Sequence, residues 1–107
     1  MAASIADGSQ TAIISTEHTL NTTTAAGSYV LGVDLSNLSN GDKLTLRIKT
    51  KVRSVGTTRT TYIANYAHSQ STLNALSIPI ASPHEFVATL EQTAGTGRSY
   101  NWEITGL

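Results

Sequence analysis

The basic residues of this chain are concentrated in one short segment. Five of them occupy odd-numbered positions: Lys43, Arg47, Lys49, Lys51 and Arg53. Side chains alternate between the two faces of a strand, so these five would project from one face of a strand over residues 43–55. Such a stripe attracts an acidic partner surface, unless acids on neighbouring strands, such as Glu85, Glu91 or Glu103, neutralise it. We take the five residues as candidate partner-facing residues and keep the neutralised stripe as the alternative.

Other residue types that carry chemistry do not form a recognisable site. The three histidines, His18, His68 and His84, are not at metal-ligand spacing, and the chain has no cysteine. No serine lies in a nucleophile-elbow motif. Residues 94–98 resemble a phosphate loop only superficially. They lack its lysine, and a strand is expected to follow them where a phosphate loop has a helix. Their two glycines instead predict a tight hairpin. We therefore predict a non-enzymatic protein with no catalytic residue, no cofactor and no metal.

Aromatic side chains are a further candidate, because an exposed group of them could stack on a sugar. The residues concerned are Tyr29, Tyr62, Tyr66, Tyr100 and Trp102. Each lies on the apolar side of its expected strand. We therefore expect these side chains, Trp102 included, to pack in the core.

The elements that would position these residues are strands. The segments with the clearest alternation of apolar and polar residues are 28–35, 43–55, 59–69, 85–92 and the segment around Trp102. Shorter strands are expected over 11–16 and 76–80, the latter at a sheet edge because Pro79 lacks a backbone donor. Residues 21–27 indicate a loop. Seven or eight short strands predict an all-β, two-sheet β-sandwich, with a jelly roll as one form of it.

Burial also predicts how two of these strands pair. Ile48 and Val52 share the apolar face of residues 43–55 and must both face the core. A loop of odd length would place Val52 opposite Tyr62 and Ile48 opposite Tyr66. An even loop would set the apolar residues against polar ones, so burial favours the odd loop.

Length and composition limit the function classes. The chain has 107 residues, with 7 basic and 7 acidic side chains. This length predicts a single domain over residues 1–107, with a folded surface of roughly 5,700 Å². Zero net charge argues against a nucleic-acid partner, and the absence of cysteine excludes disulfides. No segment has the pattern of a signal peptide or a membrane helix, so we expect no membrane contact and synthesis in a cytoplasm.

Two motifs complete the sequence evidence. The first is Asn40-Gly41-Asp42 followed by Arg47-Ile48-Lys49-Thr50-Lys51, and the second is Gln92-Thr93-Ala94-Gly95-Thr96-Gly97-Arg98. As a pair they resemble a group of short virion-associated proteins that tailed bacteriophages encode near their head genes. The similarity spans most of residues 28–104, whereas residues 1–20 do not match clearly.

The resemblance implies a capsid decoration (cement) protein on the virion surface, made in the host bacterial cytoplasm. Its partner would be the phage major capsid protein, and a homo-oligomer, with a trimer favoured, would bridge capsid subunits. Residues 1–10 are then a candidate flexible N-terminal arm. The alternative is a carbohydrate- or receptor-binding β-sandwich module on a phage tail or fibre.

Overall fold

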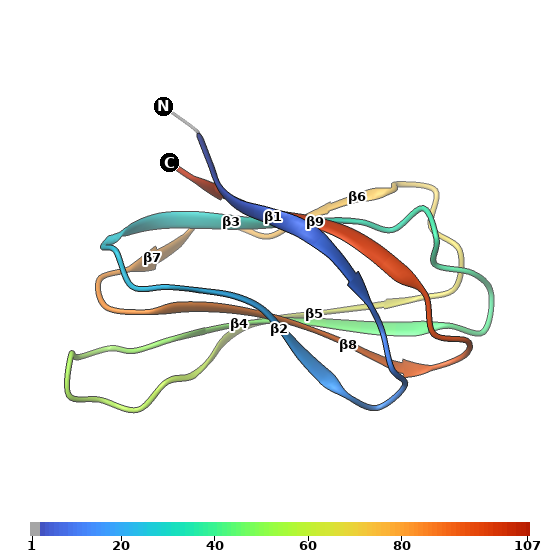
Figure 1. Cartoon of the computed structure of the whole chain (residues 1–107), viewed down its shortest axis with the longest axis horizontal. Coiled ribbons are helices and arrows are strands. Elements are labelled where there is room, and N and C mark those ends of the chain that lie inside the picture. The colour runs from blue at the N-terminus through green and yellow to red at the C-terminus, as the bar shows by residue number, and fades with distance from the viewer. Residues whose placement is uncertain (1–2) are drawn as a thin grey trace.

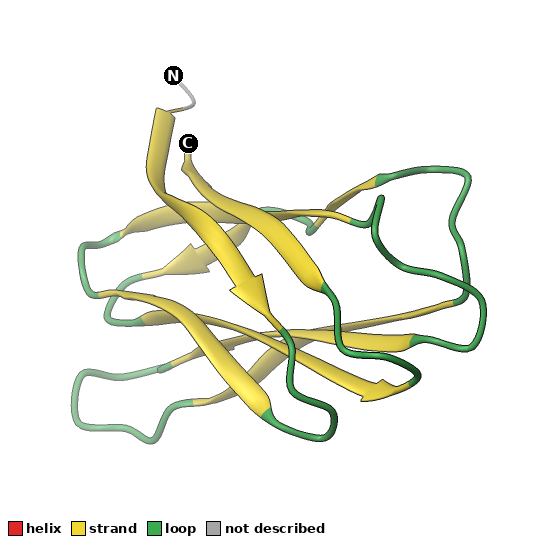
Figure 2. Cartoon of the chain, turned by 45° about the vertical axis from the view of Figure 1, so that its right-hand side comes forward, coloured by secondary structure: helices red, strands yellow, loops and turns green. Residues whose placement is uncertain are grey.

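The computed structural model describes residues 3–107, which form two antiparallel sheets packed face to face (Figure 1 and Figure 2). Sheet A contains β1 (Ala3–Thr11), β3 (Gly27–Asp34), β6 (Asn74–Leu76), β7 (Ile80–Ser82) and β9 (Ser99–Gly106). Sheet B contains β2 (Glu17–Thr23), β4 (Lys43–Thr50), β5 (Arg59–Ala67) and β8 (Phe86–Ala94). Residues 3–107 contain no helix of the length and hydropathy needed to cross a membrane.

The strand order confirms the predicted two-sheet sandwich. Sheet A has the order β1-β9-β3-β6, with β7 also beside β3, and sheet B has the order β2-β8-β4-β5. With β6 and β7 counted as one interrupted strand, this is the arrangement of an eight-stranded jelly roll. The strand predicted over 76–80 is wrong, because residues 77–79 form the interruption, where Pro79 cannot donate a backbone hydrogen bond. Its predicted position at a sheet edge is confirmed.

The core lies between the sheets and is built from alternate residues of the long strands. Eleven alternating residues of β3, β4, β8 and β9 are at most 4% exposed: Tyr29, Leu31, Val33, Leu44, Leu46, Ile48, Phe86, Ala88, Leu90, Tyr100 and Ile104. Trp102 of β9, also predicted to pack in the core, is only partly buried against it. The rings of Tyr29 and Phe86, from opposite sheets, contact each other with centroids 5.2 Å apart. The accessible surface of 5714 Å² agrees with the size expected for one compact domain.

The prediction for the end of β4 is wrong. The strand ends at Thr50, and Val52 is 89% exposed rather than buried. Thr50 pairs with Phe86, the first residue of β8, so a longer β4 would have no neighbour on that side. The register differs too: Ile48 pairs with Tyr62, not Tyr66. The loop between the closing pair Thr50 and Arg59 has eight residues, so the predicted odd loop is wrong as well. Ile48 and Tyr62 nevertheless both face the core, because a register shift between Ile48 and Lys49 leaves Thr61 as one extra residue on β5.

The first part of the chain also differs from expectation. Residues 3–10, predicted as part of a flexible arm, belong to β1 and pair with β9, whereas residues 1–2 lie outside the described residues. The strand expected over 11–16 is instead the end of β1 and a turn, in which Ser15 has a φ of 65°. β2 covers part of the predicted loop over 21–27.

Candidate functional site

The structure divides the five candidate partner-facing residues into two groups. Lys43, Arg47 and Lys49 alternate along β4 on the outer face of sheet B. Lys51 and Arg53 follow the strand and lie in the connection between β4 and β5, here called the β4–β5 loop (residues 51–58). The prediction that all five project from one strand face is therefore wrong, because β4 loses its β8 neighbour at Thr50.

Two acids neutralise the middle of the predicted stripe. The Arg47 guanidinium lies 2.8 Å from a Glu91 carboxylate oxygen and 3.7 Å from a Glu17 oxygen. The Lys49 ammonium lies 3.0 Å from Glu17. Glu17 and Glu91 are directly opposite each other on β2 and β8, so the two cations also relieve a like-charge cross-strand pair. On this part of the sheet the neutralised alternative is correct.

Hydrogen bonding strengthens this charged cluster. The Thr89 hydroxyl donates to Glu17 at 2.6 Å, and this bond, with Lys49 and Arg47, holds the pKa of the Glu17 carboxyl below its ordinary value against the opposing effect of burial. Glu91 was one of the acids named from the sequence. Glu17 was missed because its strand was not predicted.

The cations of the β4–β5 hairpin are different. Within residues 3–107, no carboxylate forms an ion pair with Lys51, Arg53 or Arg59, nor with Lys43 at the other end of β4. The loop also carries two exposed apolar side chains, Val52 (89% exposed) and Val55 (83% exposed). It therefore combines unpaired positive charge with apolar surface.

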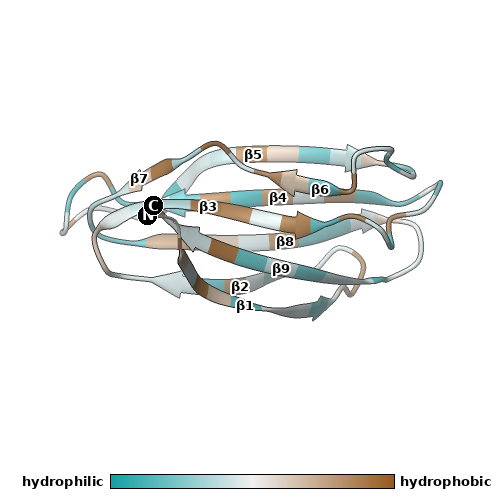
Figure 3. Ribbon diagram, turned by 90° about the horizontal axis from the view of Figure 1, so that it is seen from above, coloured by the Kyte–Doolittle hydropathy of each residue, from teal (hydrophilic) through white to brown (hydrophobic). Residues whose placement is uncertain are grey.

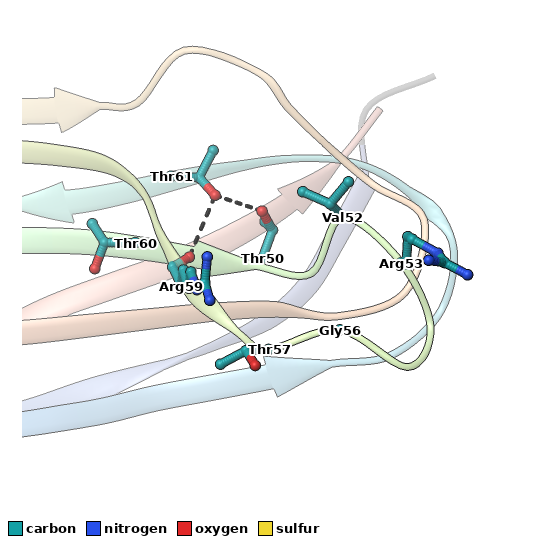
Figure 4. Close-up of a pocket in the computed structure, with 8 residues that line it drawn as sticks. All are labelled: Thr50, Val52, Arg53, Gly56, Thr57, Arg59, Thr60 and Thr61. Carbon is teal, nitrogen blue, oxygen red and sulfur yellow. Dashed lines mark hydrogen bonds between the residues drawn. The ribbon is translucent and has the colours of Figure 1, made fainter.

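A hollow of about 450 Å³ lies between this loop and the start of β5 (Figure 4). Its walls are Thr50, Val52, Arg53, Gly56, Thr57, Arg59, Thr60 and Thr61. Figure 4 shows Val52 and Arg53 projecting from the loop in different directions. The hollow is open to solvent and its polar groups are hydroxyls and guanidinium groups, so it suits an acidic surface better than a cation.

Hydrogen bonds define the shape of the loop. The Gly56 amide donates to the Arg53 carbonyl oxygen at 2.9 Å, and the hydroxyls of Thr50 and Thr61 bond to each other across its base. The Thr58 hydroxyl donates to Glu85. Glu85, a predicted neutraliser of the basic stripe, thus has a hydroxyl partner and forms no ion pair within residues 3–107.

The Asn40-Gly41-Asp42 part of the first motif meets the second motif at the opposite end of the sandwich. The Asp42 carboxylate, 1% exposed, accepts hydrogen bonds from the Ser39 amide (2.9 Å), the Thr96 amide (3.1 Å) and the Arg98 Nε (3.0 Å). Burial alone would raise the pKa of Asp42, but these bonds and the charge of Arg98 hold it below its ordinary value. Asp42 therefore ties the β3–β4 loop to the β8–β9 hairpin.

Gln92 forms the second half of this network. Its buried side-chain amide donates to the carbonyl oxygens of Ala94 (3.0 Å) and Thr96 (2.7 Å). Its side-chain oxygen accepts from the Tyr100 hydroxyl (2.9 Å) and the Arg98 amide (3.2 Å), and burial raises the pKa of Tyr100 to about 12. Folding thus explains three positions of the paired motifs, Asp42, Gln92 and Arg98. This role was not predicted, and its only signal in the sequence is that the motifs occur together.

Two of the histidines, His18 and His68, and the aromatic residues serve the fold. His18 Nε2 accepts from the Ile13 amide at 3.0 Å, and His68 Nδ1 accepts from the Gly41 amide at 2.9 Å. In the described part of the chain, no three His, Cys, Asp or Glu residues are grouped to hold a metal. Tyr29 and Tyr100 are buried, while Tyr62, Tyr66 and Trp102 are partly buried against the core, as predicted.

Comparison of this chain with protein-family models, curated proteins and solved structures finds no match. The candidate site therefore rests on geometry and charge. Of the features described above, the β4–β5 loop is the one whose charged and apolar groups are left for a partner.

Proposed function

We propose that this protein is a non-enzymatic structural protein that binds the outer capsid surface of a tailed phage and stabilises the shell. The phage context is supported by the resemblance of the paired motifs. The docking site is supported by one observation, the β4–β5 loop, where Lys51, Arg53 and Arg59 surround exposed valines without an ion-pair partner in residues 3–107. The partner would be the major capsid protein.

The distribution of charge along the chain supports an acidic partner surface. Residues 43–84 contain six basic side chains and no aspartate or glutamate. Acids from flanking strands pair with Arg47 and Lys49 but not with the cations of the hairpin tip. An acidic patch on the shell would supply the missing countercharges.

Apolar contact would provide most of the affinity. Exposed ion pairs contribute only about 0–1 kcal/mol each. Full burial of a valine side chain contributes about 1.5–3 kcal/mol, and Val52 and Val55 are both available for it. The matching surface on the capsid protein is therefore an apolar depression rimmed by carboxylates, and the charges mainly set orientation and the rate of encounter.

The alternative, a sugar- or receptor-binding module on a tail or fibre, has less support. A sugar site needs several exposed aromatic rings beside polar groups. In residues 3–107 the tyrosines and Trp102 are buried or partly buried against the core, and the hollow at the β4–β5 loop contains no aromatic residue. Copy number separates the two functions: a shell protein would approach the number of major capsid subunits, and a tail protein would be far scarcer.

The direct test uses phage particles that lack this protein. Purified protein is added, and both occupancy and the temperature of shell disassembly are measured. We expect saturable binding and a higher disassembly temperature, because a ligand of the assembled state stabilises that state. Particles that bind no protein, or that bind it only at the tail, would contradict the proposed function.

A further inference from the structure

Strand β5 has an unusual free edge. It is the last strand of sheet B, and its 9 residues make it one of the longest strands of the molecule. From Thr60 to Ala67 it contains no charged residue, no proline and no glycine. A long strand of this composition offers a row of unpaired backbone donors and acceptors to another strand.

The other three edges carry features that discourage pairing. β1 has a register shift between Ser4 and Ala6, and Asp7 lies at its centre, opposite Glu103. β2 has a register shift between Thr19 and Asn21. β6 and β7 have 3 residues each, with Pro79 between them. Shifts, charges, short length and proline are the usual means by which sheet edges avoid association, and β5 has only Arg59 and a register shift, both near its start.

An exposed apolar side chain accompanies the β5 edge. Figure 3 shows β5, β6 and β7 along one side of the sandwich and β1 and β2 along the other. Ile63 on β5 is 53% exposed. Leu76 of β6 is also exposed, but it lies over Gly32 on the outer face of sheet A, whereas Ile63 lies on the outer face of sheet B. The surface that β5 offers to a partner is therefore its backbone edge with Ile63 beside it.

We propose that a second copy of this chain covers this edge, with β5 of one protomer paired antiparallel to β5 of the other. The two B sheets then join into one continuous sheet across a two-fold axis. Tyr62, Ala64 and Tyr66 face the core, so the register must keep the same face inward in both protomers. Ile63 then lies on the outer face, near its symmetry mate.

Charge selects the antiparallel orientation. A parallel arrangement would place the two β4–β5 loops side by side. The unpaired cations Lys51, Arg53 and Arg59 of one copy would then repel those of the other. The antiparallel arrangement separates the loops by the length of β5, about 30 Å, which is well beyond the screening length of about 8 Å at physiological salt. Both loops stay free for a partner, so the dimer does not depend on the proposed capsid function.

The first test is the mass of the purified protein in solution, measured by sedimentation equilibrium over a concentration series. We expect a monomer–dimer equilibrium, and we expect Ile63→Lys to raise the dissociation constant at least tenfold. Ile13→Lys is the matched control, because Ile13 is similarly exposed (64%) but lies in the β1–β2 loop. Circular dichroism confirms that both variants are folded.

The second test uses the absence of cysteine. Single cysteines replace Ile63, Asn65 or Ala67 along β5, with Ile13→Cys as control, and the proteins are oxidised. We expect disulfide-linked dimers from one or two neighbouring β5 positions and none from the control. A monomer at all concentrations, a trimer, or a dimer insensitive to Ile63→Lys would overturn the proposal. The proposal would also be overturned if the protein is a monomer in solution and its β5 backbone amides become protected from hydrogen exchange only on phage particles. The β5 edge would then bind a capsid strand and not a second copy.

Discussion

At the scale of single residues, a buried carboxylate joins two loops of the fold. Asp42 accepts three hydrogen bonds from two loops that are far apart in the sequence, and one of them comes from the Arg98 guanidinium. A buried acceptor is costly to disturb because its donors lose their partner without regaining water. Asp34 offers a contrast, since this half-buried carboxylate accepts one bond, from the nearby Ser36 amide.

We therefore expect Asp42→Asn to lower the free energy of unfolding by about 2–4 kcal/mol. Asp34→Asn, the matched control, should cost less than about 1 kcal/mol. Urea unfolding followed by tryptophan fluorescence measures both. Equal losses in the two variants would show that the Asp42 network is not a major source of stability.

The same residue predicts part of the acid sensitivity. Because the pKa of Asp42 is lowered in the folded state, its stabilising effect is present above the ordinary carboxyl pKa and is lost as pH falls through the lowered value. Between about pH 5 and pH 2 the free energy of unfolding should fall more steeply for the native chain than for Asp42→Asn. Parallel curves over that range would rule out this contribution.

At the scale of elements, the β8–β9 hairpin requires a glycine where it meets Asp42. Gly95 has a φ of 91°, and a Cβ added there would lie 2.0 Å from Asp42 Oδ1. Gly41 has a similar φ of 94°, but an added Cβ would have no atom within 4 Å. Because Gly41 and Gly95 have similar φ values but only Gly95 lacks space for a Cβ, comparing their alanine variants separates the cost of backbone strain from that of steric overlap.

Gly41→Ala should cost about 1–2 kcal/mol from backbone strain alone. Gly95→Ala should cost at least about 3 kcal/mol, because Asp42 must also move away from its donors. Thermal unfolding of the two variants measures the difference. A Gly95→Ala protein as stable as Gly41→Ala would show that the hairpin adjusts freely.

Strands with regular alternation could be predicted from the sequence, and those without it could not. In β3 and β8 apolar residues recur at every second position, so the buried faces were predicted correctly. β2 has Leu20 as its only aliphatic residue and therefore shows no period of two. The alternation of β4 continues to Val52, but pairing stops at Thr50, and sequence alone does not reveal where a neighbouring strand begins.

At the scale of the whole molecule, a neutral chain has faces of opposite charge. The strands of sheet A contain no lysine or arginine, and three of them carry acids: Asp7, Asp34 and Glu103. Six of the seven basic residues lie between positions 43 and 59, on sheet B and its β4–β5 hairpin. The pairing of acids with part of this basic segment depends on sheet topology, which is why the free cations could not be identified from the sequence.

This segregation predicts unusual ion-exchange behaviour. At neutral pH and low salt the protein should be retained by both anion and cation exchangers, although its net charge is zero. Replacing Lys51 and Arg53 by glutamine should weaken retention on the cation exchanger, although Lys43 and Arg59 remain, and should leave retention on the anion exchanger. Retention by neither resin would mean that the opposite charges cancel at the surface.

The central claim is that the β4–β5 loop docks on an acidic capsid surface, and association rates test it most directly. Lys49→Gln and Lys51→Gln each remove one charge, two positions apart, but Lys49 is paired with Glu17 and Lys51 is unpaired in residues 3–107. Attachment of each variant to particles lacking the protein is followed at about 0.05 M and 0.5 M salt, where screening lengths are roughly 14 Å and 4 Å. We predict that salt slows attachment of the native chain, and that Lys51→Gln lowers the rate and its salt dependence clearly more than Lys49→Gln does. A rate indifferent to salt, or equal effects of the two substitutions, would contradict docking through this loop.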